Sequence, residues 1–273
     1  MSLDITAALR DWQFRPDDVT VRVIRGDDGR EKVQLRLDLG LMQMELDGRP
    51  DGRTVQGHAS WLDLHRQRQR EHDAANPDAL PYQLETEDCA ELLREGVQYY
   101  HRYVSFWALQ RYEACARDTE RNLRLILFVR DHARLERDRL QFDQWRPYVA
   151  MMHARAVATP MLEAGLHEAA IKAIDIGIRR IERFLDDYDR QDQADQVNEL
   201  SFLKRWRREA AAKAERRLPR PAGADPEPEP EPEDPVGAIR QRLDDAVAEE
   251  RYEEAADLRD ELRRLENPPP PSA

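Results

Sequence analysis

Cysteine and long apolar runs are almost absent from the sequence. Its two cysteines, Cys89 and Cys115, each lie alone in an apolar helical context and form no CxxC pair. This excludes a disulfide framework, and we expect both to be small, reduced core residues. No stretch approaches the run of about 20 apolar residues that a membrane-spanning helix needs. Residues 1–5 lack the basic patch and apolar core of a secretory signal, so we expect a cytoplasmic location.

Glycine is also scarce, with 11 in 273 residues, whereas 36% of the residues are charged. Together with frequent Glu, Arg, Ala and Leu, this composition is typical of helical proteins. The formal net charge of −12 disfavours general binding to nucleic acid, because phosphate repels an acidic chain, but it does not exclude a local basic face. We predict a mainly α (α+β) chain in five parts: an N-terminal β-ribbon region (1–52), a helical bundle (53–218), a disordered Pro/Glu linker (219–234), a helical hairpin (235–266) and a disordered tail (267–273).

One region shows the alternating pattern of β-strands. Every second residue is apolar in 19–23 and again in 33–39, with turn residues between them. After Gly40 the apolar positions shift by one residue, to Met42 and Met44, which predicts a β-bulge at the glycine. An isolated hairpin is marginally stable in water, so the ribbon must pack on the helical body or on a partner.

Helical periodicity predicts the elements of the body. They are a helix capped by Ser60 and ending near Asn76, one opened by Thr86, one from about Tyr112, a pair after Trp145 with a break at 160–165, and one over 194–218. The pair carries small residues at Gly165, Ala170, Ala173 and Gly177. These positions resemble those of tetratricopeptide (TPR) repeats, which let two helices approach closely, although no regular recurrence accompanies them. The resemblance implies a TPR-like bundle.

The linker alternates proline with glutamate over residues 226–232. Alternating prolines prevent a helix and the like charges repel one another, so we expect an extended, solvated tether. At about 3.1 Å per residue, the tether would separate the last module from the body by tens of ångströms.

Two apolar stripes follow the tether. The first consists of Ile239, Leu243, Ala246 and Val247, and the second of Tyr252, Ala255, Ala256, Leu258, Leu262 and Leu265. Their spacings are those of single helix faces. Two helices of about 15 residues cannot bury enough surface alone, so the hairpin should dimerise or dock, most simply as a four-helix arrangement.

The second stripe begins in an aromatic-Glu-x-Ala-Ala-x-Leu-Arg-Asp run, whose last residues are Arg259 and Asp260, and two spaced apolar residues, Leu262 and Leu265, follow it. The whole pattern of residues 235–266 resembles the UVR domain, also called the UvrB/UvrC motif. The resemblance implies docking between UVR hairpins, as in bacterial excision-repair subunits, Clp ATPases and their stress-linked adaptor proteins. Those proteins share the module rather than an activity, so the resemblance implies a mode of contact and no reaction.

Four other groups have both a chemical and a structural interpretation. His58, His65 and His72 recur every seven residues, as on one helix face, but a helical metal site uses closer spacings, so ordinary surface positions are favoured. A small acidic site, or equally the polar face of a strand, is compatible with Asp38, Glu45, Arg36, Arg49 and Asp51. A groove of the body, or equally exposed helix positions, is compatible with Arg117, Asp118, Thr119, Arg121 and Asn122.

The fourth group is a basic cluster around Trp206, made of Lys204, Arg205, Arg207, Arg208, Arg216, Arg217 and Arg220. It is compatible with contacts to phosphate groups or to the acidic tether. A solvated helix face with the indole in the core is favoured, because the chain is acidic as a whole.

The predicted function is a non-enzymatic adaptor or scaffold whose helical body binds one partner while the hairpin binds another UVR-bearing protein or a second copy. Excision-repair subunits and Clp ATPase components are the expected partners; we expect no direct nucleic-acid or membrane contact. No Walker-type loop or nuclease pattern occurs, and we predict no catalytic residue, cofactor or metal. Two alternatives stay open: an accessory factor of excision repair, and an enzyme of unknown class in residues 1–218.

Overall fold

The structure, a computed structural model, describes residues 4–75, 80–217 and Leu262. The chain divides into two compact units, residues 1–218 and 219–273. The predicted tether (219–234), hairpin (235–266) and tail (267–273) lie outside the described residues, except for Leu262, which is helical. The following description therefore concerns the first unit.

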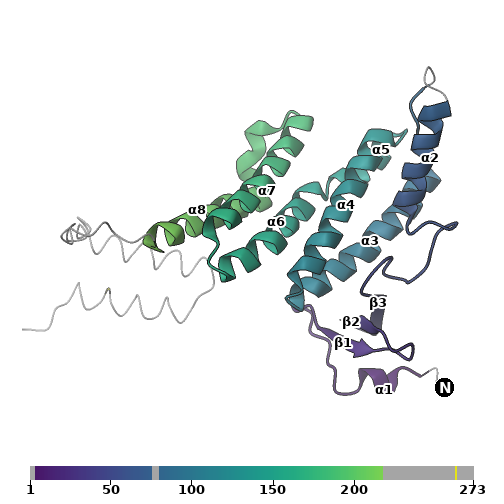
Figure 1. Ribbon diagram of the computed structural model, residues 1–273, viewed down its shortest axis with the longest axis horizontal. Coiled ribbons are helices and arrows are strands. Elements are labelled where there is room, and N and C mark those ends of the chain that lie inside the picture. Colours follow the sequence, from purple (N-terminus) through teal and green to yellow (C-terminus); the bar gives the residue numbers. More distant parts are fainter. Residues whose placement is uncertain (1–3, 76–79, 218–261, 263–273) are drawn as a thin grey trace, which may run out of the picture. The chain divides into compact units, whose positions relative to one another are not determined.

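Within residues 4–217 the chain is mainly α with an N-terminal three-stranded antiparallel sheet, which confirms the predicted fold class (Figure 1). The strands are β1 (Val21–Arg25), β2 (Glu31–Leu37) and β3 (Gly40–Glu45). The helices are α1 (Thr6–Leu9), α2 (Trp61–Ala75), α3 (Thr86–Ala108), α4 (Tyr112–His132), α5 (Glu136–Asp143), α6 (Arg146–Glu163), α7 (His167–Asp187) and α8 (Asn198–Arg217), with a 3-10 helix η1 (Gln191–Gln196) before α8. In the part of the chain that the structure describes, no helix is both long and apolar enough to cross a membrane.

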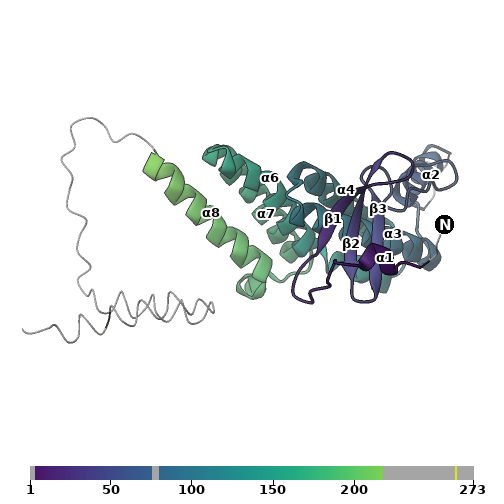
Figure 2. The same cartoon turned by 90° about the horizontal axis from the view of Figure 1, so that it is seen from below.

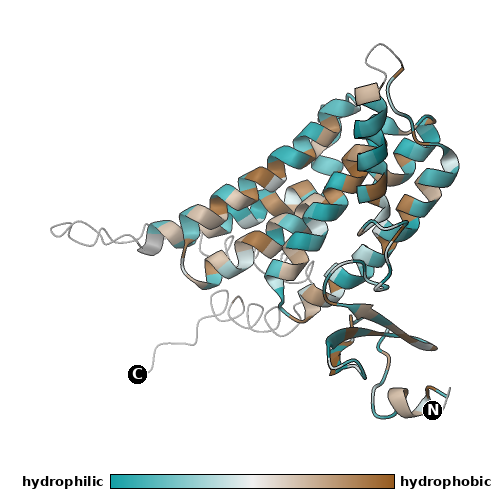
Figure 3. Cartoon of the chain, turned by 45° about the vertical axis from the view of Figure 1, so that its right-hand side comes forward, coloured by the Kyte–Doolittle hydropathy of each residue, from teal (hydrophilic) through white to brown (hydrophobic). Residues whose placement is uncertain are grey.

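The long helices pack one after another across the body. Helix α3 packs on α4, α4 on α6, α6 on α7 and α7 on α8, while α2 lies against α3 and α5 against α4 (Figure 1). Hydrophobic and hydrophilic residues alternate along these helices (Figure 3), as amphipathic elements require. Helix α7 has apolar residues at helical spacing in its sequence, and it buries these residues on one face: Ala170, Ile174, Ile178, Ile181 and Leu185.

Gly177 marks a close approach of three helices. A Cβ atom at this position would lie 2.6 Å from the Cβ of Ala154 on α6 and 3.0 Å from Cδ1 of Leu203 on α8. The first distance is shorter than real Cβ atoms show and the second is tighter than most Cβ contacts, so the predicted role of this small residue in close packing is confirmed. Gly165 adopts a φ of 75° and makes the turn between α6 and α7.

Two helix ends differ from the prediction. Helix α6 continues through Pro160 to Glu163 instead of breaking at the proline. Pro160 lies in the last turn, where its missing N–H removes one intrahelical bond and the chain reverses only afterwards, at Gly165. The last helix begins at Asn198 rather than 194, because η1 occupies the preceding residues.

The predicted β-bulge at Gly40 is wrong. Leu37 of β2 pairs directly with Gly40 of β3, and a two-residue turn joins them. Leu39 in this turn is 90% exposed. In this register odd-numbered residues of β2 face even-numbered residues of β3, as Val33 faces Met44. The one-residue shift of the apolar pattern therefore marks a reversal of the chain.

The sheet lies beneath α3 and α4 (Figures 1 and 2) and packs on the helical body, as predicted. Its Val33 and Met44 join a core cluster with Phe106 of α3. Cys115 of α4 belongs to the same cluster, whereas Cys89 of α3 lies in the larger core of the helices. Burial raises the pKa of both thiols to about 12, so the two cysteines are protonated core residues, as expected.

Candidate functional site

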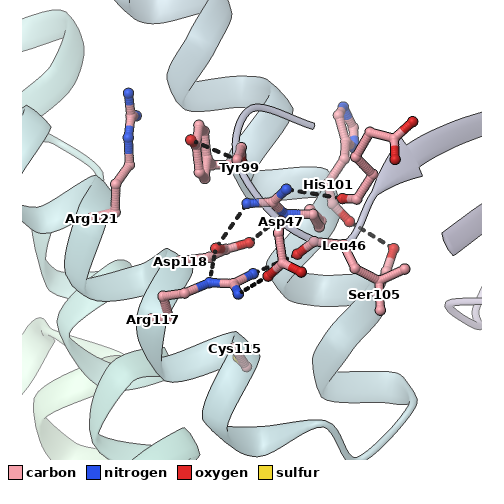
Figure 4. Close-up of polar contacts among 12 residues, drawn as sticks. Leu46, Asp47, Tyr99, His101, Ser105, Cys115, Arg117, Asp118 and Arg121 are labelled. Atoms are coloured by element: carbon pink, nitrogen blue, oxygen red, sulfur yellow. Dashed lines mark hydrogen bonds and ion pairs between the residues drawn. The ribbon is translucent and has the colours of Figure 1, made fainter. Parts of the chain in front are cut away.

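A buried polar network joins the ribbon to the helices (Figure 4). Asp118 of α4 accepts two hydrogen bonds from Arg102 of α3, at 2.6 Å from Nε and 3.0 Å from Nη2. Both side chains are only 1% exposed. Arg102 also donates through Nη1 to the carbonyl oxygen of Glu45 at the end of β3, at 2.9 Å. This ion pair therefore ties α3, α4 and β3 together at one point.

Arg117 lies beside Asp118 in the same network (Figure 4), and its side chain is 45% exposed. Its Nε lies 3.1 Å from Oδ1 of Asp118, its Nη1 pairs with Asp47 at 2.6 Å, and its Nη2 donates to the carbonyl oxygen of Leu46 at 2.6 Å. Burial lowers the pKa of Arg117, but the two carboxylates outweigh it and the net shift is upward. Arg117 thereby holds the loop that follows β3.

Glu95 of α3 is a second buried carboxylate, 1% exposed. It accepts the backbone N–H groups of Trp61 at 2.8 Å and Leu62 at 3.3 Å, which open α2. Arg121 donates to it, and Nε of Arg49 lies 3.3 Å away. Since the first N–H groups of a helix have no intrahelical partner, this carboxylate satisfies two of them and suits the helix dipole.

Smaller polar groups complete this arrangement. Ser60 acts as the predicted N-cap, because its Oγ accepts the N–H of Asp63 at 3.1 Å. Thr119 donates to the carbonyl oxygen of Cys115, and Asn122 donates to that of Gly96. Asp118 and Thr119 are buried in contacts within the body, so neither a groove nor an exposed face describes them. Asn122 is buried but also lines a cavity of the body, as the groove interpretation predicts. Chemically, the network holds the ribbon, α2 and the helices together.

The other acidic candidates do not converge. Asp38 lies in the turn between β2 and β3, whereas Glu45 forms an ion pair with Lys32 of the neighbouring strand. Arg49 pairs with Asp51 at 2.9 Å. The Glu45–Lys32 pair matches the interpretation as the polar face of a strand, whereas Arg49 and Asp51 lie in the loop after β3, where Arg49 also contacts Glu95.

The three histidines do not share one helix face. His58 precedes α2 and lies 2.8 Å from Oε1 of Gln67. His65 is fully buried, with Nδ1 2.9 Å from the hydroxyl of Tyr82, and burial lowers the pKa of His65. The ring of His72 meets the same tyrosine edge-on, at 5.9 Å between centroids. Among the residues that the structure describes, no three His, Cys, Asp or Glu side chains are placed to share a metal ion.

The basic cluster of α8 is partly neutralised by α7. Lys204 pairs with Glu182 at 3.0 Å, and Arg207 pairs with Asp175 at 2.6 Å. Trp206 is half-buried against the helical core. These contacts favour the interpretation as a solvated helix face over a phosphate-binding surface.

The C-terminal stripes are the remaining candidate site, and of their residues the structure describes only Leu262. Comparison with protein families decides what this segment resembles. Residues 235–267 match the UVR family, the UvrB/uvrC motif. The UVR match confirms the resemblance found in the sequence, in the same place. No curated protein and no solved structure matches the chain.

Sequence reasoning named Asp118 but missed the buried charged residues of α3. On α3 these charges lie within the apolar stripe that also contains Leu92 and Phe106. Glu95 and Arg102 are seven residues apart on that stripe, and each is 1% exposed. Opposite charges on an otherwise apolar face were a usable signal, because buried charges require partners.

Proposed function

We propose that this chain is a non-enzymatic adaptor that docks through its UVR motif, while the helical body provides a second contact surface. The observation that carries the proposal is the family match of residues 235–267. UVR motifs mediate contacts between proteins in excision repair and in Clp-related systems. The partner in this proposal is another UVR-bearing protein of these systems or a second copy of the chain.

The docking surface in this proposal is the apolar stripe of the two predicted helices. It contains Leu243, Val247, Ala255, Ala256 and Leu262. A hairpin of this size gains stability by burying the stripe against a matching pair of helices. A long tether between the motif and the body would raise the effective concentration of the second contact without fixing its geometry.

A matched pair of substitutions tests the proposal. Leu243→Arg places a charge in the stripe, and Gln241→Arg adds the same charge two residues away, outside the stripe. The full chain is measured by sedimentation velocity for self-association, and by calorimetric titration with a purified UVR-bearing excision-repair subunit and with a UVR-bearing Clp component. We expect Leu243→Arg to weaken the contact at least about a hundredfold, because a buried unpaired charge costs several kcal/mol. Gln241→Arg should bind as the unchanged chain does.

Equal binding by both variants would show that the stripe is not the contact. If the unchanged chain neither self-associates nor binds the excision-repair subunit or the Clp component, docking through the UVR motif is refuted. Self-association alone would assign the motif to dimer formation. Binding to only one of the two partners would name the pathway.

An accessory role in excision repair is the second candidate, since the matched motif is named after two proteins of that system. In this version the chain reaches DNA through its partner or through the basic face of α8. A mobility shift of duplex DNA by the purified chain that weakens as salt rises would favour direct contact. No shift would leave only the indirect route.

A further inference from the structure

A cavity of about 360 Å³ opens between α3, α4, α5 and α6. Its inner wall is deeply buried and includes Leu125 and Phe142, each 2% exposed. Its mouth is open, with Val97 of α3 and Trp145 exposed to solvent. Sites for small organic molecules occupy about 300–1,000 Å³ and have mostly apolar walls, so the cavity falls within their range.

The wall of the cavity carries a hydroxyl that has no hydrogen-bond partner among the described residues of the protein. Tyr103 of α3 lines the cavity and is 1% exposed. Within residues 4–75 and 80–217, no hydrogen bond forms to this hydroxyl, nor to those of Tyr100 and Tyr148, which line the same cavity. The Tyr100 side chain is 39% exposed, and the oxygen of Tyr103 is not closed off from solvent although its ring is buried, so these hydroxyls are open to a ligand in the cavity. Burial raises the pKa of Tyr103, and the neighbouring phenols raise it further, so the hydroxyl is a neutral donor and acceptor.

Aromatic rings shape the space beside this hydroxyl. The ring of Tyr100 stands nearly perpendicular to that of Tyr103, with centroids 5.5 Å apart, and lies 6.4 Å from that of Tyr148. Ring faces and edges in this arrangement suit a planar guest. No Asp, Glu, Lys or Arg occurs among the described residues that line the cavity. His101 also lines it, and burial lowers the pKa of His101, which disfavours its charged form. An ionic ligand would lose its hydration without gaining a counter-charge, so the chemistry selects a neutral one.

We propose that this cavity binds a flat, neutral, largely apolar organic molecule that carries one hydrogen-bonding group directed at the hydroxyl of Tyr103. The apolar body of the ligand fills the space between the aromatic rings. The ligand site lies in the first unit of the chain and does not depend on docking by the UVR motif. The two proposals therefore stand or fall by different experiments.

The probe for the test is 2-naphthol, which is flat and carries one hydroxyl, with naphthalene as the analogue that lacks it. Calorimetric titration of the full chain should give saturable binding of one 2-naphthol per chain. Tyr103→Phe should weaken 2-naphthol binding about threefold to tenfold, the value of one hydrogen bond, and leave naphthalene binding unchanged. The matched control is Tyr99→Phe, because the hydroxyl of Tyr99 donates to the carbonyl oxygen of Gly48 at 3.2 Å, away from the cavity.

A second pair of variants tests the location independently of the hydroxyl. Val97→Trp places an indole across the mouth and should abolish binding of both probes, whereas Arg94→Trp adds the same ring to an exposed position of α3 outside the lining. Circular dichroism checks that each variant is folded. The inference is overturned if 2-naphthol does not saturate the unchanged chain, or if Val97→Trp binds normally. It is also overturned if Tyr103→Phe shows no loss or Tyr99→Phe shows the same loss.

Discussion

Removing the carboxylate of Asp118 should strongly destabilise the helical body. In Asp118→Ala the guanidinium of Arg102, 1% exposed, loses both hydrogen bonds to the carboxylate and keeps only the one to the carbonyl oxygen of Glu45. Breaking a buried pair on one side leaves an uncompensated charge and costs about 3–5 kcal/mol. Since domains are stable by about 5–15 kcal/mol, this is a large share of the free energy of unfolding.

Urea unfolding followed by far-UV circular dichroism measures the loss as a lower midpoint. The control is Asp47→Ala, which removes the other carboxylate paired with Arg117. The Asp47 side chain is 86% exposed, so its removal should cost at most about 1 kcal/mol. The double variant Arg102→Met with Asp118→Leu replaces the pair with apolar groups and should recover much of the lost stability, because no buried charge is left unpaired.

Two results would contradict this reasoning. If Asp118→Ala and Asp47→Ala have the same small effect, the guanidinium of Arg102 finds compensation elsewhere and the pair does not hold the ribbon. If the double variant is as unstable as Asp118→Ala, the loss comes from altered packing rather than from an unpaired charge.

Two further predictions use the same unfolding assay. Gly177→Ala should destabilise the body by about 1–3 kcal/mol, because its new Cβ would lie 2.6 Å from that of Ala154; at an open helix position the same change would stabilise by about 1 kcal/mol, so the sign is decisive. Burial lowers the pKa of His65 from its ordinary value of 6.5, because it disfavours the charged imidazole. The unfolded chain therefore takes up the proton first as the pH falls below 6.5, and the free energy of unfolding decreases by up to about 1.4 kcal/mol per pH unit. His65→Gln should therefore flatten the decline in stability between about pH 7 and pH 5, and an unchanged decline would assign it to other groups.

The elements of the body followed from local signals. The cap at Ser60 and the stripe of α7 each depend on residues within a few positions of one another, so a single sequence contains what is needed. The turn near Gly40 did not follow, because a bulge and a two-residue reversal shift the apolar pattern by the same one residue. A bulge and a reversal differ in which strand the residues after Gly40 pair with, and tertiary structure determines that pairing.

The candidate sites also differ in how far local sequence predicts them. A UVR motif is contiguous and has a fixed spacing, so it can be found in the sequence although the structure describes only Leu262 of it. The network around Asp118 depends on which face of α4 meets α3, and the spacing within α4 is the same for a buried carboxylate as for an exposed one. The cavity beside Tyr103 is still further from any pattern, because it is the volume that four helices leave unfilled. Periodicity predicts which residues face inward, whereas packing determines where the inward faces fail to meet and leave a cavity that a ligand can enter.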